Sequence, residues 1–209
     1  MLAAMGSIGD LSSTPVDVVI SVVVGYLVGS IPVANLVARR RASLDLRDVG
    51  DGNPGFWNAR ETLGRMAAVP VFVGDVAKGL VAAGLGAVLA DPGVWGMAFV
   101  AGGAAMVGHA FPIVSRFRGG RSVLTFVGTV TVAATVPTLI SIGVVVVVFG
   151  ATRSFAWGAR AGIAALPFVQ IAVEGPYRTA ATGVLMTFIG LRFATAARVE
   201  RRSGPPTQP

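Results

Sequence analysis

The chain has 209 residues, of which 54% are apolar and 13% are charged, and its mean hydropathy is +0.74; because soluble domains carry about 25% charged residues, most soluble classes are excluded. It has no cysteine and one histidine, which excludes disulfides, thiolate metal sites and cysteine nucleophiles and leaves almost no nitrogen-based metal cluster. The net charge of +7 favours orientation in a membrane and contact with anionic lipid over binding of nucleic acid.

Long apolar runs predict the membrane spans, since a transmembrane helix needs about 20 apolar residues. The runs cover residues 16–38, 66–90, 93–115, 122–150, 160–175 and 177–195. The run at 122–150 is long for one helix and short for two. Dividing it at Pro137 gives seven spans, with halves at 122–135 and 137–150 that must be short or tilted. The fold class is then an all-α polytopic membrane protein.

The basic residues decide how the run at 122–150 is divided. With seven spans, 15 of the 17 basic residues fall on one side of the membrane, which the positive-inside rule assigns to the cytoplasm. A single helix would instead place Arg153 and Arg160 outside. We therefore expect about seven transmembrane helices in a bacterial-type inner (plasma) membrane, with the N-terminus outside and the C-terminus cytoplasmic.

The rest of the chain adds no second domain. Residues 1–202 are expected to form a single integral membrane domain, and residues 203–209 a disordered tail. No cleaved signal peptide is expected, because the first 15 residues have no basic residue ahead of their apolar part.

One long polar insert, residues 39–65, combines closely spaced glycines with polar donors. Between residues 50 and 60 it reads GDGNPGFWNAR. Glycines let backbone amides approach a bound anion, and asparagine and arginine add donors that suit a phosphate. A flexible connector whose glycines merely make turns is the alternative, and glycine content alone favours it.

A second basic cluster, RFRGGR at 116–121, follows the third span. Taken alone it indicates arginines that contact lipid headgroups. However, both clusters are predicted at the same membrane face, together with Arg153 and Arg160. Their convergence favours a site for a polyanionic ligand at the inner interface.

Three ionisable residues fall within predicted spans. Asp75 and Lys78 lie three residues apart, so they share a helical face and can pair; such costly residues face the bundle interior, as a structural ion pair or a functional one. His109 is interpreted as an interhelical hydrogen-bond partner rather than a proton carrier. A small transporter is a further interpretation of these residues, but no paired half-helix repeat supports it.

Ordered motifs link these segments to a known family. They are GYLVGSIP at 25–32, DLRDVG at 45–50, GNxGxxNxR at 52–60, TLGR at 62–65, DxxKG at 75–79, GHxFP at 108–112, FRGGR at 117–121 and TRS at 152–154. In this order and spacing they resemble the bacterial acyl-phosphate:glycerol-3-phosphate acyltransferases of the PlsY type. The resemblance implies a seven-helix membrane enzyme that moves an acyl group from acyl phosphate to the 1-hydroxyl of glycerol-3-phosphate, giving lysophosphatidic acid and phosphate.

The resemblance also implies residue roles. Arg60 and Asn58 are expected in catalysis, and Asp75, Lys78 and His109 in support. The expected substrate-binding residues are Gly52, Asn53, Gly55, Arg118, Gly119, Gly120 and Arg121. Acyl phosphate, glycerol-3-phosphate and membrane lipid are the expected partners, no metal or cofactor is required, and the oligomeric state stays open. Such enzymes are understood to position two anions, with a substrate phosphate as the base.

Three features depart from the family pattern, and those at Asp51 and at residues 192–196 support a rival hypothesis. Asp51 stands where the family has a serine, and its carboxylate would repel a substrate phosphate unless an arginine pairs with it. Arg118 and Arg121 replace lysines, which keeps the charge but changes its shape. The segment 192–196, RFATA, lacks the histidine, glutamate and asparagine of the family. The rival is a catalytically silent homologue that binds phosphorylated lipid precursors or anionic lipid as a regulator or partner.

Overall fold

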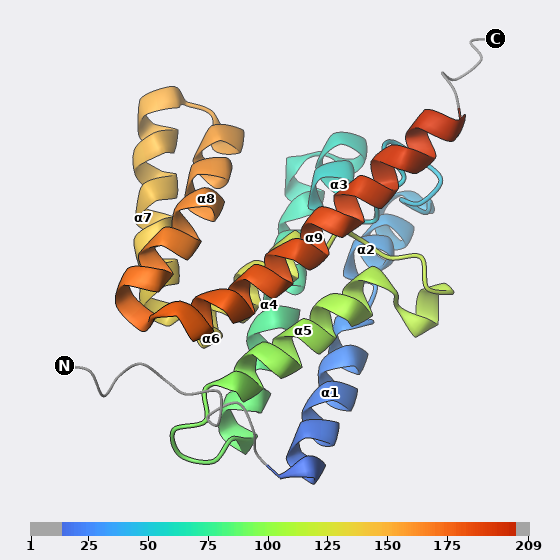
Figure 1. The fold of residues 1–209 in the computed structure, drawn as a ribbon. Helices are drawn as coiled ribbons and strands as arrows, with labels where there is room; N and C mark the ends of the chain where they lie inside the picture. Colours follow the sequence, from blue (N-terminus) through green and yellow to red (C-terminus); the bar gives the residue numbers. More distant parts are fainter. Residues whose placement is uncertain (1–13, 204–209) are drawn as a thin grey trace.

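The computed structural model describes residues 14–203, and within them the chain is all helical, which confirms the predicted fold class (Figure 1). The elements are α1 (Pro15–Gly29), α2 (Val33–Ala42), α3 (Phe56–Leu63), α4 (Arg65–Leu89), α5 (Gly96–Ala110), a 3₁₀ turn (Ile113–Ser115), α6 (Val123–Ala133), α7 (Thr135–Thr152), α8 (Phe155–Glu174) and α9 (Pro176–Ser203).

Six segments of the described residues are long and apolar enough to cross a membrane. They are Pro15–Ala42, Arg65–Leu89, Gly96–Ser115, Thr135–Thr152, Phe155–Glu174 and Pro176–Arg198. The seventh predicted span is α6, whose 11 residues rise about 16 Å, roughly half of the hydrocarbon core. Among residues 14–203, six segments are therefore long enough to cross on their own, and α6 is a short additional helix.

The run at 122–150 is divided in two, but the break falls at Ala134 and not at Pro137. Ala134 leaves the helical conformation, with φ −143° and ψ 58°. Pro137 instead occupies the first turn of α7, where its missing N–H is not needed. The Thr138 hydroxyl donates to the Val130 carbonyl at 2.9 Å and so fastens the two helices across the break.

The basic segments gather at one end of the bundle. Figure 1 shows the α2–α3 loop, the α5–α6 loop, the α7–α8 turn and the C-terminal end of α9 at this end, which we call the basic end. The α4–α5 and α8–α9 connections lie at the opposite end. Arg178 is at that opposite end, where it pairs with Glu174 at 3.7 Å and lies over the Trp95 ring. The basic loops therefore share one end of the bundle, as predicted.

Close helix packing depends on glycines at the contacts. A Cβ added to Gly29 of α1 would lie 2.0 Å from the Ala105 carbonyl oxygen of α5. A Cβ added to Gly79 of α4 would lie 2.0 Å from the Thr125 carbonyl oxygen of α6. Small residues let helix backbones approach closely in lipid. These contacts hold α1 against α5 and α4 against α6. The buried polar residues Asp75 and Lys78 of α4 and His109 of α5 belong to these packed helices.

The predicted C-terminal tail begins inside a helix, because Ser203 is the last residue of α9. Residues 204–209 lie outside the described residues.

The outer surface of the bundle carries many exposed valine, leucine and phenylalanine side chains, such as Val88, Val147 and Phe168, as expected where helices face lipid.

Candidate active site

A small hollow of about 20 Å³, partly open to solvent, lies at the basic end between α1, α2, α4, α5 and two loops, the α2–α3 connection (the first loop) and the α5–α6 connection (the second loop). Its lining includes both the ionisable residues of the predicted spans, Asp75, Lys78 and His109, and part of the second basic cluster. The lining residues are Gly29, Ile31, Pro32, Val33, Ala34, Asn35, Pro54, Asp75, Lys78, His109, Pro112, Ser115, Arg118, Gly119 and Gly120.

The floor of the hollow is a buried group of three ionisable side chains. Lys78 Nζ donates to Asp75 Oδ1 at 2.9 Å and lies 3.3 Å from His109 Nδ1. The side chains of Asp75, Lys78 and His109 are only 3%, 5% and 8% exposed. The predicted Asp75–Lys78 pair is confirmed, and His109 joins it from the neighbouring helix, as expected for an interhelical partner.

The Gly119–Gly120 segment forms one wall, and it packs directly on the end of α5. The Gly119 and Gly120 N–H groups donate to the carbonyl oxygens of Ala110 and His109, at 3.1 and 3.0 Å. A Cβ added to Gly120 would lie 2.3 Å from His109 Nε2. The glycines therefore provide a close backbone approach to His109. The family resemblance implied that they bind substrate.

Arg192 of α9 holds this wall from outside, a role that the sequence did not indicate. Its Nη2 donates to the carbonyl oxygens of Gly119 and Gly120, both at 3.3 Å. Its guanidinium lies 4.6 Å from the centre of the Phe111 ring. The long separation in sequence leaves no local pattern that pairs Arg192 with the glycines.

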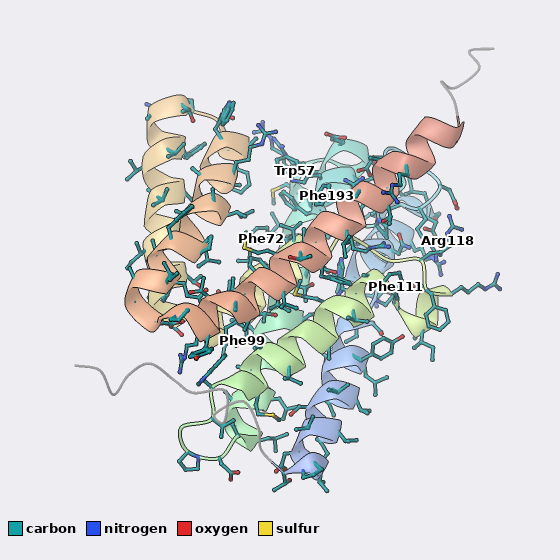
Figure 2. The ribbon with its side chains drawn as sticks, viewed as in Figure 1. Trp57, Phe72, Phe99, Phe111, Arg118 and Phe193 are labelled. Carbon is teal, nitrogen blue, oxygen red and sulfur yellow. The ribbon has the colours of Figure 1, made fainter. Side chains whose placement is uncertain are left out.

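Asp51 has the arginine partner that its position requires. Its Oδ2 lies 3.1 Å from Arg121 Nη1, so the pair joins the first loop to the second. The Arg121 guanidinium also lies 4.8 Å from the centre of the Phe193 ring. Figure 2 labels the two aromatic rings that Arg121 and Arg192 cover, Phe193 on α9 and Phe111 at the end of α5.

Asn58 of α3 is buried against the first loop and fastens it. Its Nδ2 donates to the carbonyl oxygens of Leu46 and Val49 at 2.8 and 2.9 Å, and its Oδ1 accepts from the Thr62 hydroxyl at 3.0 Å. Gly50, with φ +61°, passes so close that an added Cβ would lie 2.1 Å from Asn58 Oδ1. The amide of Asn58 thus shapes the loop from inside.

Arg47 connects the first loop to the second. It pairs with Asp45 and donates from Nη1 to the Ser115 carbonyl oxygen at 3.0 Å. The Arg47 side-chain hydrogen bonds hold the pKa of Asp45 well below its usual range. The ionised pair therefore fixes how the first loop sits beside the hollow.

The hollow brings together part of the expected site. It includes Arg118, Gly119, Gly120 and the three supporting residues. Arg60 is not among the lining residues, and its guanidinium lies 5.1 Å from the centre of the Trp57 ring. The other expected residues outside the lining are Gly52, Asn53, Gly55, Asn58 and Arg121, although Pro54 of the same loop does line it.

Comparison with known proteins identifies the chain's relatives. The family described as glycerol-3-phosphate acyltransferase matches residues 19–200. The chain belongs to this family. It is 37% identical over 180 residues to glycerol-3-phosphate acyltransferase 5 of Dehalococcoides mccartyi, covering 82% of this chain and 74% of that one. It is 35% identical over 166 residues to the glycerol-3-phosphate acyltransferase of Clostridioides difficile, covering 75% and 78%.

Solved structures show the same fold. The crystal structure of PlsY (YgiH), an integral membrane glycerol 3-phosphate acyltransferase, in its glycerol 3-phosphate form matches with a TM-score of 0.74 at 26% identity, over 87% of this chain and 90% of that chain. The lysophosphatidic acid form matches with a TM-score of 0.69 at 24% identity. The expected glycerol-3-phosphate acyltransferase family and the multi-pass membrane fold are both confirmed.

Proposed function

We propose that this glycerol-3-phosphate acyltransferase takes its acyl group from acyl phosphate and transfers it to the 1-hydroxyl of glycerol-3-phosphate, forming lysophosphatidic acid. One observation supports a specific site for this reaction. Arg118, the Gly119–Gly120 wall and the buried Asp75–Lys78–His109 group line a single hollow at the basic end. Donor and acceptor are both phosphorylated anions, and the product is a lipid. A basic hollow at the end of a membrane bundle suits all three.

The reaction needs positioning and charge stabilisation more than a dedicated base. The 1-hydroxyl oxygen attacks the acyl carbon, the bond from that carbon to the phosphate oxygen breaks, and the phosphate leaves with the hydroxyl proton. Holding the two reactants together supplies much of the rate, and fixed positive groups stabilise charge that develops on the acyl oxygen and the phosphate. We assign this cationic role to Arg118, with Arg121 and Arg60 as further cations of the basic end.

Residues that touch no substrate complete the proposed site. Asn58 shapes the first loop, Arg47 joins it to the second, and Arg192 holds the Gly119–Gly120 wall. We assign positioning roles to all three, so that Asn58, expected in catalysis from the family motif, acts through the loop that it fastens.

The basic end is proposed to face the cytoplasm of a bacterial-type inner membrane. Arginine-rich segments favour the cytoplasmic side, and small phosphorylated substrates are then available at the hollow. The N-terminus is accordingly outside and the C-terminus cytoplasmic.

The direct test is acyl transfer by purified protein in detergent or proteoliposomes. Palmitoyl phosphate and radiolabelled glycerol-3-phosphate should give lysophosphatidic acid together with an equal amount of phosphate. Arg118→Ala should lower kcat/KM on the order of 10²-fold, because a charged donor at the reacting anions is lost. No product above background, with PlsY active in the same assay, would refute the proposal.

The silent homologue remains the second candidate because Asp51 and the segment 192–196 depart from the family. Its signature would be binding of glycerol-3-phosphate without turnover. Growth of an acyltransferase-deficient bacterial strain that carries this chain would exclude it. The Asp51–Arg121 pair favours the active enzyme, since the arginine neutralises the unfavourable carboxylate.

A further inference from the structure

His109 is the chain's single histidine, and the surroundings of its two ring nitrogens differ. Nδ1 lies 3.3 Å from Lys78 Nζ, and that ammonium is paired with Asp75 at 2.9 Å. An ammonium group only donates hydrogen bonds, so Nδ1 must accept. The distance from Nδ1 to Asp75 Oδ1 is 3.6 Å, too long for a hydrogen bond. A neutral ring in this position therefore carries its hydrogen on Nε2.

The Nε2 nitrogen lies beside Gly120, in the wall of the hollow. His109 lines the hollow with Gly119 and Gly120, and a Cβ added to Gly120 would lie 2.3 Å from Nε2. The histidine is 8% exposed, and among residues 14–198 the hydrogen bonds found for its ring involve Nδ1 alone. Nε2 is not one of the fully buried side-chain atoms without a partner among the described residues, so its N–H is accessible to a ligand that enters the hollow.

We propose that His109 donates a hydrogen bond from Nε2 to a phosphoryl oxygen of the bound substrate, and that Lys78 fixes the tautomer that makes this possible. The proposal rests on the proposed function for the identity of the ligand. Asp75 and Lys78 are positioning residues here, because they act through the ring. His109 then binds substrate and does not serve as the general base, since its outward nitrogen already carries a hydrogen.

Nitrogen-15 NMR tests the tautomer directly, because the chain has one histidine. The full chain is produced with ¹⁵N-labelled histidine and a histidine-free affinity tag, so that all ring signals come from His109. We expect Nδ1 to resonate as an unprotonated nitrogen and Nε2 as a protonated one. An Nδ1–H tautomer or an imidazolium in the free protein at pH 7 would overturn the proposal.

Ligand addition extends the same experiment without any need for turnover. Glycerol-3-phosphate, inorganic phosphate and an alkylphosphonate that mimics acyl phosphate are each titrated in. The ligand whose phosphoryl oxygen accepts the bond should shift the Nε2 signal and its proton while the tautomer is kept. Unchanged Nε2 signals at saturation with all three would overturn the proposal, whether or not the protein catalyses acyl transfer.

Two variants separate the two nitrogens. The amide nitrogen of His109→Gln reaches about as far as Nε2, whereas that of His109→Asn reaches only as far as Nδ1. We expect His109→Asn to lower kcat/KM on the order of 10²-fold and His109→Gln by less than about tenfold, by analogy with the loss of one donor at a developing anion. The KM that rises identifies the substrate whose phosphate is bound. Equal losses in both variants, with both eluting as folded protein, would contradict the donor role.

Discussion

At the scale of single residues, Asp51 and Arg121 decide how a phosphate gains access to the second basic cluster. A carboxylate and a phosphate compete for the same guanidinium, and here the carboxylate lies 3.1 Å from it. Because both side chains are partly exposed, water weakens the pair, and its contribution is small. The substitution at residue 51 is therefore expected to tune substrate binding and not to abolish it.

Replacing Asp51 tests this competition. Asp51→Ser should lower the KM for glycerol-3-phosphate about two- to fivefold, the range expected from releasing one exposed ion pair. Steady-state kinetics measure the change. Asp48→Ser is the matched control, because Asp48 is an exposed acid of the same loop that changes the net charge equally. An unchanged or higher KM for Asp51→Ser would contradict the competition.

Asp45 gives the first loop a predictable response to acid. Hydrogen bonds from Arg47 lower the pKa of Asp45 in the folded protein, so the ionised carboxylate stabilises the fold above its unfolded pKa of about 4. This stabilisation is lost as the pH falls below that value towards the folded pKa. Between pH 7 and pH 3, the melting temperature of the wild type should fall further than that of Asp45→Asn.

The control for the acid response is Asp48→Asn, which lacks the Arg47 hydrogen bonds of Asp45 and should follow the wild type. Melting in detergent, monitored by intrinsic fluorescence, provides the measurement. Parallel curves for the wild type and Asp45→Asn would show that the pair contributes nothing to stability.

At the scale of helices, backbone contacts at glycines set the position of the ionisable residues. Gly79 follows Lys78 directly and meets the Thr125 carbonyl. Gly79→Leu should push α4 and α6 apart, lower stability by about 1–3 kcal/mol and reduce activity by moving Lys78. Gly84→Leu is the control, since an added Cβ there meets nothing within 4 Å. Equal shifts in melting temperature for the two variants would contradict the packing.

Helix α9 acts on the site through one side chain. Arg192→Ala removes the donors that hold the Gly119 and Gly120 carbonyls, and it should lower kcat/KM on the order of 10²-fold. Arg192→Lys should recover only part of the loss, because an ammonium lacks the planar fork of a guanidinium. Steady-state kinetics give both values. Arg198→Ala, an exposed arginine on the same helix, is the control, and equal activity of Arg192→Ala and Arg198→Ala would remove the positioning role.

The helices and the gathering of the basic loops at one end were predictable because they depend on local composition. Apolar runs set the spans, and the arginines divide the run at 122–150 in two. The break at Ala134 was not predictable, since Pro137 is the stronger local signal and is accommodated in a first turn. The hydrogen bonds of Asn58, Gly119 and Arg192 were also not predictable, because the two partners of each bond come close together only in the folded chain.

At the scale of the whole molecule, the chain's lack of cysteine makes its topology easy to test. Ala151 and Pro92 lie at opposite ends of the bundle and are exposed. With the basic end cytoplasmic, a membrane-impermeant maleimide should label Pro92→Cys in intact cells, and Ala151→Cys only after lysis. Labelling of Ala151→Cys in intact cells would place the α7–α8 turn outside and leave α6 and α7 as a single crossing.

The hollow at the basic end lies where α4, α5 and both loops meet, and the proposed function requires a substrate phosphate to bind there. An experimental structure determined with glycerol-3-phosphate tests this most directly. The phosphate should lie between Arg118 and His109, within hydrogen-bond distance of Nε2. Phosphate density outside this hollow, for instance beside Arg39 and Arg40 of α2 with the space next to His109 empty, would contradict the assigned site.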